Sequence, residues 1–370
     1  MKFRKKNKYF LKKYKRNRYV RNEYFWKKKS LNNKIYTKSK IFAKFYKIIT
    51  IFFMTILYSF NIFINETYDQ NNNYGLTSEQ KMKDYLTKNF SIMKRFECVD
   101  CGFFSFYIVY LGCINKLLSI GKIPIVDLKT YTNAFNKGNT SIYNPWELFF
   151  YQPYNYTIEE VLAYAKNYEY YQCSKNNYRP DEINIYDHKD QMIFWHDFAN
   201  KYIPVRNEII KEAEDIMKQL FGNSKNVLGV KIRGTDYISL RPYGHSIPPK
   251  VEEVILDVKK MDEQYNYDFI FFASEDELIK QKFSSEFKNK IKLLNPNVVV
   301  KYSYTDNHRI SVNKNIYGNL EYLKNYILNT IILSKCLDFV TSRCCGATGV
   351  YILTKGFRYS KAYNLGEYKL

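Results

Sequence analysis

The sequence predicts an α/β fold whose C-terminal half is a parallel, doubly wound sheet. Short apolar runs of strand length alternate along that half with stretches of helical length. Polar residues directly follow several of these runs, as expected for a site at the carboxyl ends of parallel strands. With 46% hydrophobic residues and only 14 glycines and 9 prolines among 370 residues, the chain can also bury a substantial core.

The N-terminus predicts a membrane anchor. Residues 1–47 contain 19 Lys and Arg and a single acidic residue, Glu23. The uncharged run 48–64 follows, and as a helix it would span roughly 25 Å, near the short limit for a bilayer core. Because basic flanks stay in the cytosol, we expect a cytosolic tail at 1–47, a transmembrane anchor at 48–64 and a stem at 65–85. A buried core helix and a cleaved signal peptide are the alternatives.

The net charge of +22 belongs mostly to the tail. The remaining 323 residues carry 39 basic and 35 acidic side chains, a difference of +4. Nucleic acid is therefore not an expected partner, because a folded nucleic-acid-binding domain would itself be basic.

Residues 86–204 predict a first α/β domain. Gly102–Ile120 is typical of a buried helix, and Lys122–Leu128 is typical of a strand. The aromatic segment Asn144–Pro153 is either a plug in the core or the lining of a cleft.

Residues 205–370 predict a second domain in which strands and helices alternate. Helices are expected at 205–221, 251–260, 276–287, 317–335 and 350–354. Strands are expected at 226–232, 267–273, 297–302 and 337–340, with a turn of small residues at 341–349. This alternation predicts a parallel sheet with its site at the carboxyl ends of the strands.

The first polar group at a strand end begins at Lys231. Lys231, Arg233 and Thr235 share one face, because alternate side chains of a strand point the same way. The guanidinium of Arg233 can bind a diphosphate through two parallel hydrogen bonds, and Gly234 leaves room for close backbone approach. Asp236 either orients these donors or forms a structural ion pair with Arg233.

Two further groups follow later strands. Asp276, within Ser274–Glu277, either caps a helix or accepts hydrogen bonds from a nucleotide base or ribose. The segment Thr341–Gly349 contains Ser342 and Gly346, and it places N–H groups and hydroxyls at a helix start, where anions bind.

His245 lies in a proline-bounded loop 12 residues after Arg233. It is a candidate general base or phosphate donor, and a plain loop histidine is the alternative. The chain has no Asp-x-Asp and its seven cysteines lack zinc-site spacing, so we expect no metal and no cofactor. In an oxidising compartment, disulfide bonds are allowed among Cys98, Cys101, Cys113 and Cys173, but the sequence does not assign their pairing.

Four segments resemble, in order and spacing, the motifs of the α1,6-fucosyltransferase superfamily, which includes N-glycan core and nodulation fucosyltransferases. They are Val230–Tyr237, His245–Ile247, Phe271–Asp276 and Leu333–Ser342. The resemblance covers roughly 226–350, and Cys98–Asp127 is similar to the opening of the family's N-terminal domain.

The resemblance implies a GT-B-like fold of two Rossmann-type domains, with the acceptor side at 86–204 and the donor side at 205–370. It also implies inverting, metal-independent transfer of fucose from GDP-fucose to a glycan or glycoprotein acceptor. We expect catalytic roles for Arg233, His245 and Asp236. We expect the donor to contact Lys231, Arg233, Gly234, Thr235, Asp276, Ser342 and Gly346.

The chain departs from the family pattern at several positions. Gly234 replaces a second cation, while Lys231 adds one. Arg241 stands where the core enzymes carry a glutamate proposed as base, and Cys344 and Cys345 replace two serines. The resemblance therefore leaves the base and the acceptor open.

A short cytosolic tail, one span, a stem and a catalytic domain are the plan of Golgi glycosyltransferases. We expect a type II membrane protein with a luminal catalytic domain, or an inner-membrane protein if the source is bacterial. The alternatives are a membrane-anchored pseudoenzyme or glycan-binding protein that keeps the cleft, a transferase for another nucleotide sugar, and a basic nucleic-acid-binding protein.

Overall fold

The computed structural model describes residues 78–97, 99, 101–136, 143–174, 182–234, 236–294 and 318–369. The predicted tail, the predicted anchor, most of the predicted stem, the strand expected at 297–302, Cys98 and Thr235 lie outside the described residues. Among the helices of the described part, none is long and apolar enough to cross a membrane.

A smaller sheet of three parallel strands comes first. Its strands are β1 (Asn89–Lys94), β2 (Ile123–Val126) and β3 (Asn167–Gln172), in the order β2-β1-β3. The surrounding helices are α2 (Ser78–Thr87), α3 (Phe103–Ser119) and α4 (Ile158–Tyr164). Met93 and Val126 face the core of α3, whereas Phe90 and Ile92 pack with residues of α2 and α4 on the other face.

The connection to the second half is mostly helical. It contains the short 3-10 helices η1 (Pro145–Leu148) and η2 (Pro153–Asn155), followed after β3 by α5 (Glu182–Asp187), α6 (Lys189–Tyr202) and α7 (Asn207–Phe221). In η1, Trp146 is fully buried and stacks on Phe103 at 5.7 Å between ring centroids. The aromatic segment at 144–153 is thus a plug in the core.

The larger sheet has five parallel strands. They are β4 (Val227–Lys231), β5 (Phe269–Ala273), β6 (Ile291–Lys292), β7 (Asp338–Ser342) and β8 (Ser360–Tyr363), in the order β6-β5-β4-β7-β8. Counted from β4 the order is 3-2-1-4-5, as in doubly wound nucleotide-binding sheets. The order reverses between β4 and β7, and crevices for ligands form at that point.

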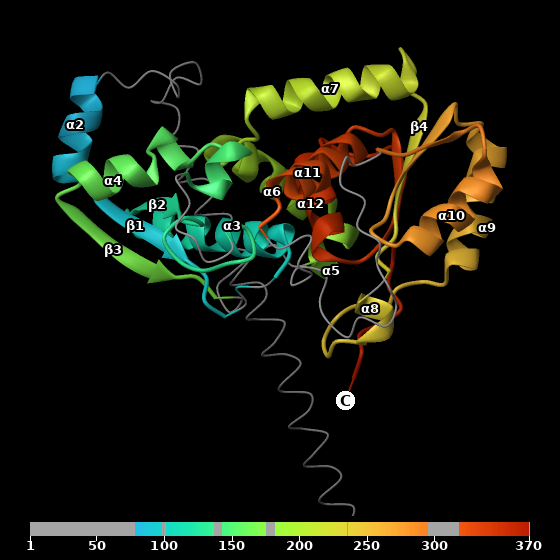
Figure 1. The fold of residues 1–370 in the computed structure, drawn as a ribbon, viewed down its shortest axis with the longest axis horizontal. Helices are drawn as coiled ribbons and strands as arrows, with labels where there is room; N and C mark the ends of the chain where they lie inside the picture. Colours follow the sequence, from blue (N-terminus) through green and yellow to red (C-terminus); the bar gives the residue numbers. More distant parts are fainter. Residues whose placement is uncertain are drawn as a thin grey trace, which may run out of the picture. The chain divides into compact units, whose positions relative to one another are not determined.

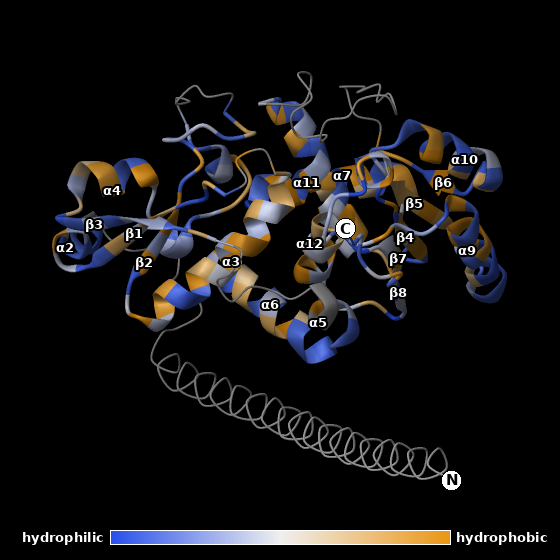
Figure 2. Cartoon of the chain, turned by 90° about the horizontal axis from the view of Figure 1, so that it is seen from below, coloured by the Kyte–Doolittle hydropathy of each residue, from blue (hydrophilic) through white to orange (hydrophobic). Residues whose placement is uncertain are grey.

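Helices cover both faces of the larger sheet, as doubly wound topology requires. They are α9 (Val251–Tyr265), α10 (Glu277–Phe287), α11 (Leu320–Ser334) and α12 (Cys345–Leu353), together with α7; the short α8 (Asp236–Ser239) follows β4. Leu228 and Val230 pack under α9 and α10, whereas Val227 and Phe339 pack under α7, α11 and α12. Figure 2 shows β4 and β5 of this sheet as mostly hydrophobic, in contrast to the hydrophilic β3 of the smaller sheet.

One hydrophobic core joins the two sheets. Helices α11 and α12 lie between them in Figure 1, and α12 packs directly on α3 and α6. The contact between α12 and α3 is close, because a Cβ atom at Gly349 would lie 2.3 Å from the ring of Phe104. The core cluster accordingly runs from Met93 to Ile352.

The structure confirms the α/β class and the expected strands at β2, β4, β5 and β7, but it corrects several boundaries. Residues 341–349 are not a turn before a helix at 350–354: β7 continues to Ser342 and α12 already begins at Cys345. Small residues are typical of a turn, but Gly346 and Gly349 here allow α12 to approach α11 and α3. Helix α2 takes up the last part of the segment expected to be a stem, where Tyr85 is buried.

Candidate functional site

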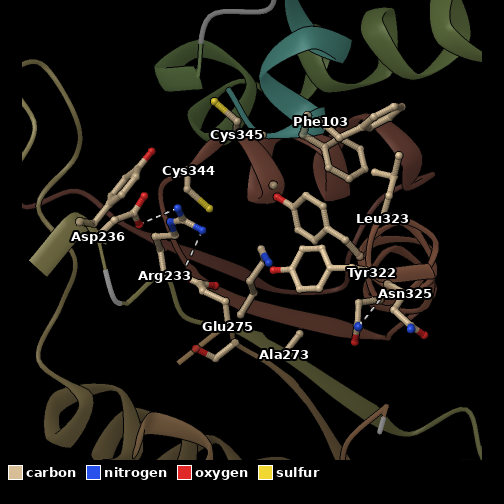
Figure 3. A pocket seen from close by; sticks show the side chains of 18 of the residues that line it. Phe103, Arg233, Asp236, Ala273, Glu275, Tyr322, Leu323, Asn325, Cys344 and Cys345 are labelled. Atoms are coloured by element: carbon tan, nitrogen blue, oxygen red, sulfur yellow. Dashed lines mark hydrogen bonds and ion pairs between the residues drawn. The ribbon is translucent and has the colours of Figure 1, made fainter. Parts of the chain in front are cut away.

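A cavity of about 500 Å³ opens at the carboxyl ends of β4 and β5 and beside the end of β7. The beginnings of α3, α10 and α12 and one face of α11 form its walls (Figure 3). The register aligns the strand ends, since Lys231 pairs with Ala273 on one side and with Thr341 on the other. Residues distant in sequence therefore meet at the switch point of the sheet.

Arg233 lies in this cavity, held between two carboxylates. Its Nη2 donates to Asp236 Oδ1 at 2.6 Å, and its Nη1 lies 3.1 Å from Glu275 Oε1 (Figure 3). The guanidinium also stacks over the ring of Tyr237 at 4.8 Å, and the backbone N–H of Arg233 donates to Ser342 Oγ at 2.7 Å. These contacts fix the guanidinium in one orientation, so it is preorganised for a ligand.

Glu275, not Asp276, is the carboxylate that reaches the cavity after β5. Its Oε1 accepts the N–H of Gly234 at 2.9 Å in addition to its contact with Arg233. Asp276 is the N-cap of α10, where its Oδ1 accepts from the N–H groups of Leu278 and Ile279, and it does not line the cavity. Of the two interpretations open for Asp276, the geometry supports the helix cap.

Gly234 is required by close packing. A Cβ atom there would lie 2.7 Å from Asp276 Oδ2 and 2.8 Å from Ile279 Cδ1. The chain after β4 thus passes tightly over the start of α10, and this passage brings Arg233 and Glu275 together. The neighbouring Thr235 lies outside the described residues.

The charges of the site shift the pKa values of both members of its central ion pair. Burial alone would raise the pKa of Glu275, but the charges of Arg233 and Lys231 hold it below its usual value. Burial alone would lower the pKa of Arg233, but Glu275 and Asp236 raise it well above its usual value. Both groups are therefore ionised near neutral pH.

Lys231 is the unusual residue of the site. Its side chain is only 4% exposed and lines the cavity, yet its ammonium forms no ion pair or hydrogen bond with any described residue. Its nearest aromatic neighbour is Tyr326 of α11, whose ring centroid lies 5.2 Å from Nζ. The charge of Lys231 acts on the Glu275 carboxylate, but the buried ammonium has no hydrogen-bond acceptor among the described residues, so this position suits an anionic ligand.

Two helix N-termini open onto the cavity. Helix α12 begins after Cys344, whose thiol is a weaker acceptor than the oxygens that usually cap helices, and α3 begins after Gly102, which has no side chain. Burial raises the pKa of the Cys344 thiol although Lys231 and Arg233 oppose this, so the thiol stays neutral. Both helix ends add positive potential to that of the two cations.

The start of α12 is held from the other half of the chain. The hydroxyl of Tyr186 in α5 lies 3.1 Å from the carbonyl oxygen and 3.4 Å from the amide nitrogen of Cys344. Next to it, Arg343 Nη2 donates to Asp187 Oδ1 at 2.8 Å. The position of this helix end therefore depends on α5.

His245 lines the cavity on the side of α8. Its ring packs edge-on against Tyr237 at 5.2 Å, and its Nδ1 lies 3.1 Å from the carbonyl oxygen of Tyr243. In the tautomer that donates from Nδ1, the lone pair of Nε2 is available to accept a proton. Asp236, by contrast, is 6% exposed and committed to Arg233.

Sequence reasoning missed the polar face of α11. Tyr322, Asn325, Tyr326 and Asn329 all line the cavity, and Figure 3 shows the first two projecting from this helix. Their spacing of three, four and seven residues places them on one side of a helix whose buried residues are mostly apolar. The sequence contains this spacing, but these residues belong to none of the motifs that predict the site.

Among the described residues, no group of three or more His, Cys, Asp or Glu side chains could hold a metal ion. Of the cysteines considered for disulfides, Cys113 and Cys173 are buried thiols outside any disulfide, whereas Cys101 is disulfide-bonded.

Fold and site together define an α/β protein with a doubly wound parallel sheet and a cavity, lined by two basic side chains, at the switch point of that sheet. No protein-family model and no curated protein sequence matches the chain.

Solved structures that are similar to the chain include fucosyltransferases. They include POFUT1 in complex with GDP, with a TM-score of 0.47 and 8% identity over 75% of this chain and 98% of that one. The α-1,6-fucosyltransferase NodZ soaked with GDP-fucose has a TM-score of 0.41 and 11% identity over 72% and 93%. Fucosyltransferase NodZ from Bradyrhizobium has a TM-score of 0.40 with the same identity and coverage.

Proposed function

We propose that this protein is a glycosyltransferase that binds a nucleoside diphosphate sugar in the cavity, and specifically an inverting fucosyltransferase that uses GDP-fucose. The observation that carries the proposal is the buried, unpaired ammonium of Lys231 beside the fixed guanidinium of Arg233. Two cations and two helix N-termini facing one point suit a diphosphate. The sequence motifs that resemble fucosyltransferases support the choice of sugar.

The cavity has room for such a donor. Its volume of about 500 Å³ lies within the range of small-molecule sites. The cationic end receives the diphosphate, while the neutral polar side chains of Asn325, Asn329 and Gln281 line the part that remains for the nucleoside. Phe103 and Phe135, at the α3 side, line the part open to sugar and acceptor.

The reaction is a displacement at the anomeric carbon. The acceptor hydroxyl oxygen forms a bond to that carbon, and the bond from carbon to the diphosphate oxygen breaks, its electron pair staying on the diphosphate. Lys231 and Arg233 stabilise the charge that develops there. The proton of the acceptor hydroxyl passes to Nε2 of His245, because Asp236 is engaged with Arg233.

The same proposal includes the membrane. Segment 48–64 would anchor a type II protein, with its catalytic domain in the Golgi lumen in a eukaryote, and in a bacterium it would hold the enzyme at the inner membrane. The uncharged run after a tail with 19 basic residues supports this arrangement.

The test measures GDP binding and turnover of GDP-fucose by the full chain, with other nucleotide sugars for comparison. Arg233→Ala should abolish both. Arg206→Ala is the matched control, because Arg206 also pairs with a carboxylate and stacks on a ring, but outside the cavity. Unchanged binding and turnover in Arg233→Ala would refute the proposal. GDP binding without turnover of any nucleotide sugar would identify a pseudoenzyme.

A further inference from the structure

Tyr326 on α11 is a candidate for a role in the cavity that no sequence motif assigns to it. Its hydroxyl makes no hydrogen bond with any described residue, although the ring is half-buried and lines the cavity. A buried or half-buried hydroxyl normally finds a partner. The free hydroxyl is therefore available to a ligand in the cavity.

The hydroxyl points at the start of α12. A Cβ atom at Gly346 would lie 2.3 Å from Tyr326 Oη and 2.9 Å from Lys231 Cε. Glycine is thus the residue that lets the hydroxyl, the lysine stem and the first turn of α12 approach one another. The Tyr326 hydroxyl and the side chain of Lys231 therefore meet at the first turn of α12.

The ring of Tyr326 is fixed in place. It packs edge-on against Phe104 of α3 at 5.3 Å, and the ammonium of Lys231 lies 5.2 Å from its centroid. A donor that is already oriented needs no rearrangement when charge develops, which is the condition for strong electrostatic stabilisation. Burial also raises the pKa of Tyr326 well above its usual value, so the hydroxyl keeps its proton and serves as a donor.

We propose that Tyr326 is a catalytic residue that donates a hydrogen bond to the departing diphosphate, sharing this anion with Lys231 and the N-terminus of α12. This inference rests on the proposed function and deepens it. As the bond from the anomeric carbon to the diphosphate oxygen breaks and its electron pair moves to the diphosphate, the hydroxyl of Tyr326 stabilises the new charge without transferring its proton.

The experiment compares Tyr326→Phe with wild type in the full chain. Loss of one preorganised donor should lower kcat for GDP-fucose by about 10²-fold with little change in KM, because the donor acts mainly on the transition state. The melting temperature without ligand should stay unchanged, since the hydroxyl has no partner within the described protein.

Tyr322→Phe is the matched control, one helical turn away on the same face of α11. A loss of kcat equal to that of Tyr326→Phe would show that any hydroxyl on this face matters, and would overturn the assignment. Unchanged kcat in Tyr326→Phe would overturn it as well. A fall in kcat that only accompanies a lower melting temperature would assign Tyr326 a structural role instead.

Gly346→Ala adds an independent test. Its Cβ atom would push the Tyr326 hydroxyl aside, so this variant should reproduce the kcat loss. Because the Cβ atom would also lie 2.9 Å from Lys231 Cε, the double variant should lose more than Tyr326→Phe alone but less than the sum of the two single losses. Additive losses would contradict the proposal. A wild-type protein that binds no GDP would refute the proposed function itself, whereas normal turnover in both wild type and Tyr326→Phe would refute the role of Tyr326 alone.

Discussion

Lys231→Met should weaken GDP binding and stabilise the unliganded protein at the same time. Methionine keeps a side chain of similar length but removes an ammonium that is 4% exposed and has no ion-pair partner among the described residues. A hydrogen bond from a charged group contributes about 1.5–3 kcal/mol, so Kd for GDP should rise by about 10- to 150-fold. The cost of burying the unpaired charge disappears in the variant, which should increase the free energy of unfolding by about 1 kcal/mol.

The assay is calorimetric titration with GDP together with thermal unfolding in its absence. An increase of 1 kcal/mol corresponds to roughly 2 °C in Tm for a protein of this size. Lys259→Met is the control, because its ammonium is exposed and pairs with Glu286 at 2.5 Å, so neither quantity should change much. If Lys231→Met lowers Tm and leaves Kd unchanged, Lys231 is a structural residue and the anion-site reasoning is wrong.

Three further predictions concern the residues around the site. Glu275→Gln should lower Tm at neutral pH, and the difference in Tm from wild type should shrink below about pH 4. The pKa of Glu275 is lowered in the folded protein, so its stabilisation is lost as the pH falls through that pKa. A Tm difference that is independent of pH would contradict the ion pair. Asp276→Ala should lower the free energy of unfolding, measured with denaturant, by about 1 kcal/mol and leave GDP affinity unchanged, because Asp276 caps α10 outside the cavity. Weakened GDP binding at unchanged stability would show that Asp276 binds the donor. Gly349→Ala should destabilise by about 1–3 kcal/mol through its clash with Phe104, whereas Gly102→Ala, where an added Cβ meets no atom within 4 Å, should not; equal stabilities would refute the close packing.

The apolar strands of the larger sheet could be predicted because they are buried on both faces. All five residues of β4 and of β7 are buried, and such strands read as continuous apolar runs. By contrast, β3 is an exposed edge strand rich in tyrosine, and most of β8 is also exposed or half-buried. Neither carries the hydrophobic pattern that marks a strand, so both could only be found through their pairing with β1 and β7.

The candidate site was predictable where charged side chains stand at the end of a predicted strand. Lys231 and Arg233 follow directly from the position of β4, and both line the cavity. The sequence could not separate Glu275 from Asp276, because the choice depends on whether the cap falls one residue earlier or later. Sequence analysis does not identify Tyr326, because its proposed role depends on the distance between α11 and α12, and no local sequence pattern contains that distance.

Ion pairing distinguishes the two residues that we consider as bases. In the sequence, Asp236 and His245 were both near Arg233 and both could accept a proton. In the structure, the Asp236 carboxylate is bound to Arg233 at 2.6 Å, whereas His245 keeps a free ring nitrogen in the tautomer that donates to Tyr243. This difference in hydrogen bonding, which only the three-dimensional arrangement contains, is why the proposed mechanism uses His245 and not Asp236 as the base.

The close contact of α12 with α3 bears on how the protein unfolds. Each sheet lacks a complete core without the other, because α3, α6, α11 and α12 share one cluster of buried side chains. Residues on both sides of the predicted boundary at 204/205 should therefore lose structure together, in a single heat-absorption peak. Neither half expressed alone would keep its apolar surface covered, so the smallest fragment worth expressing contains both sheets.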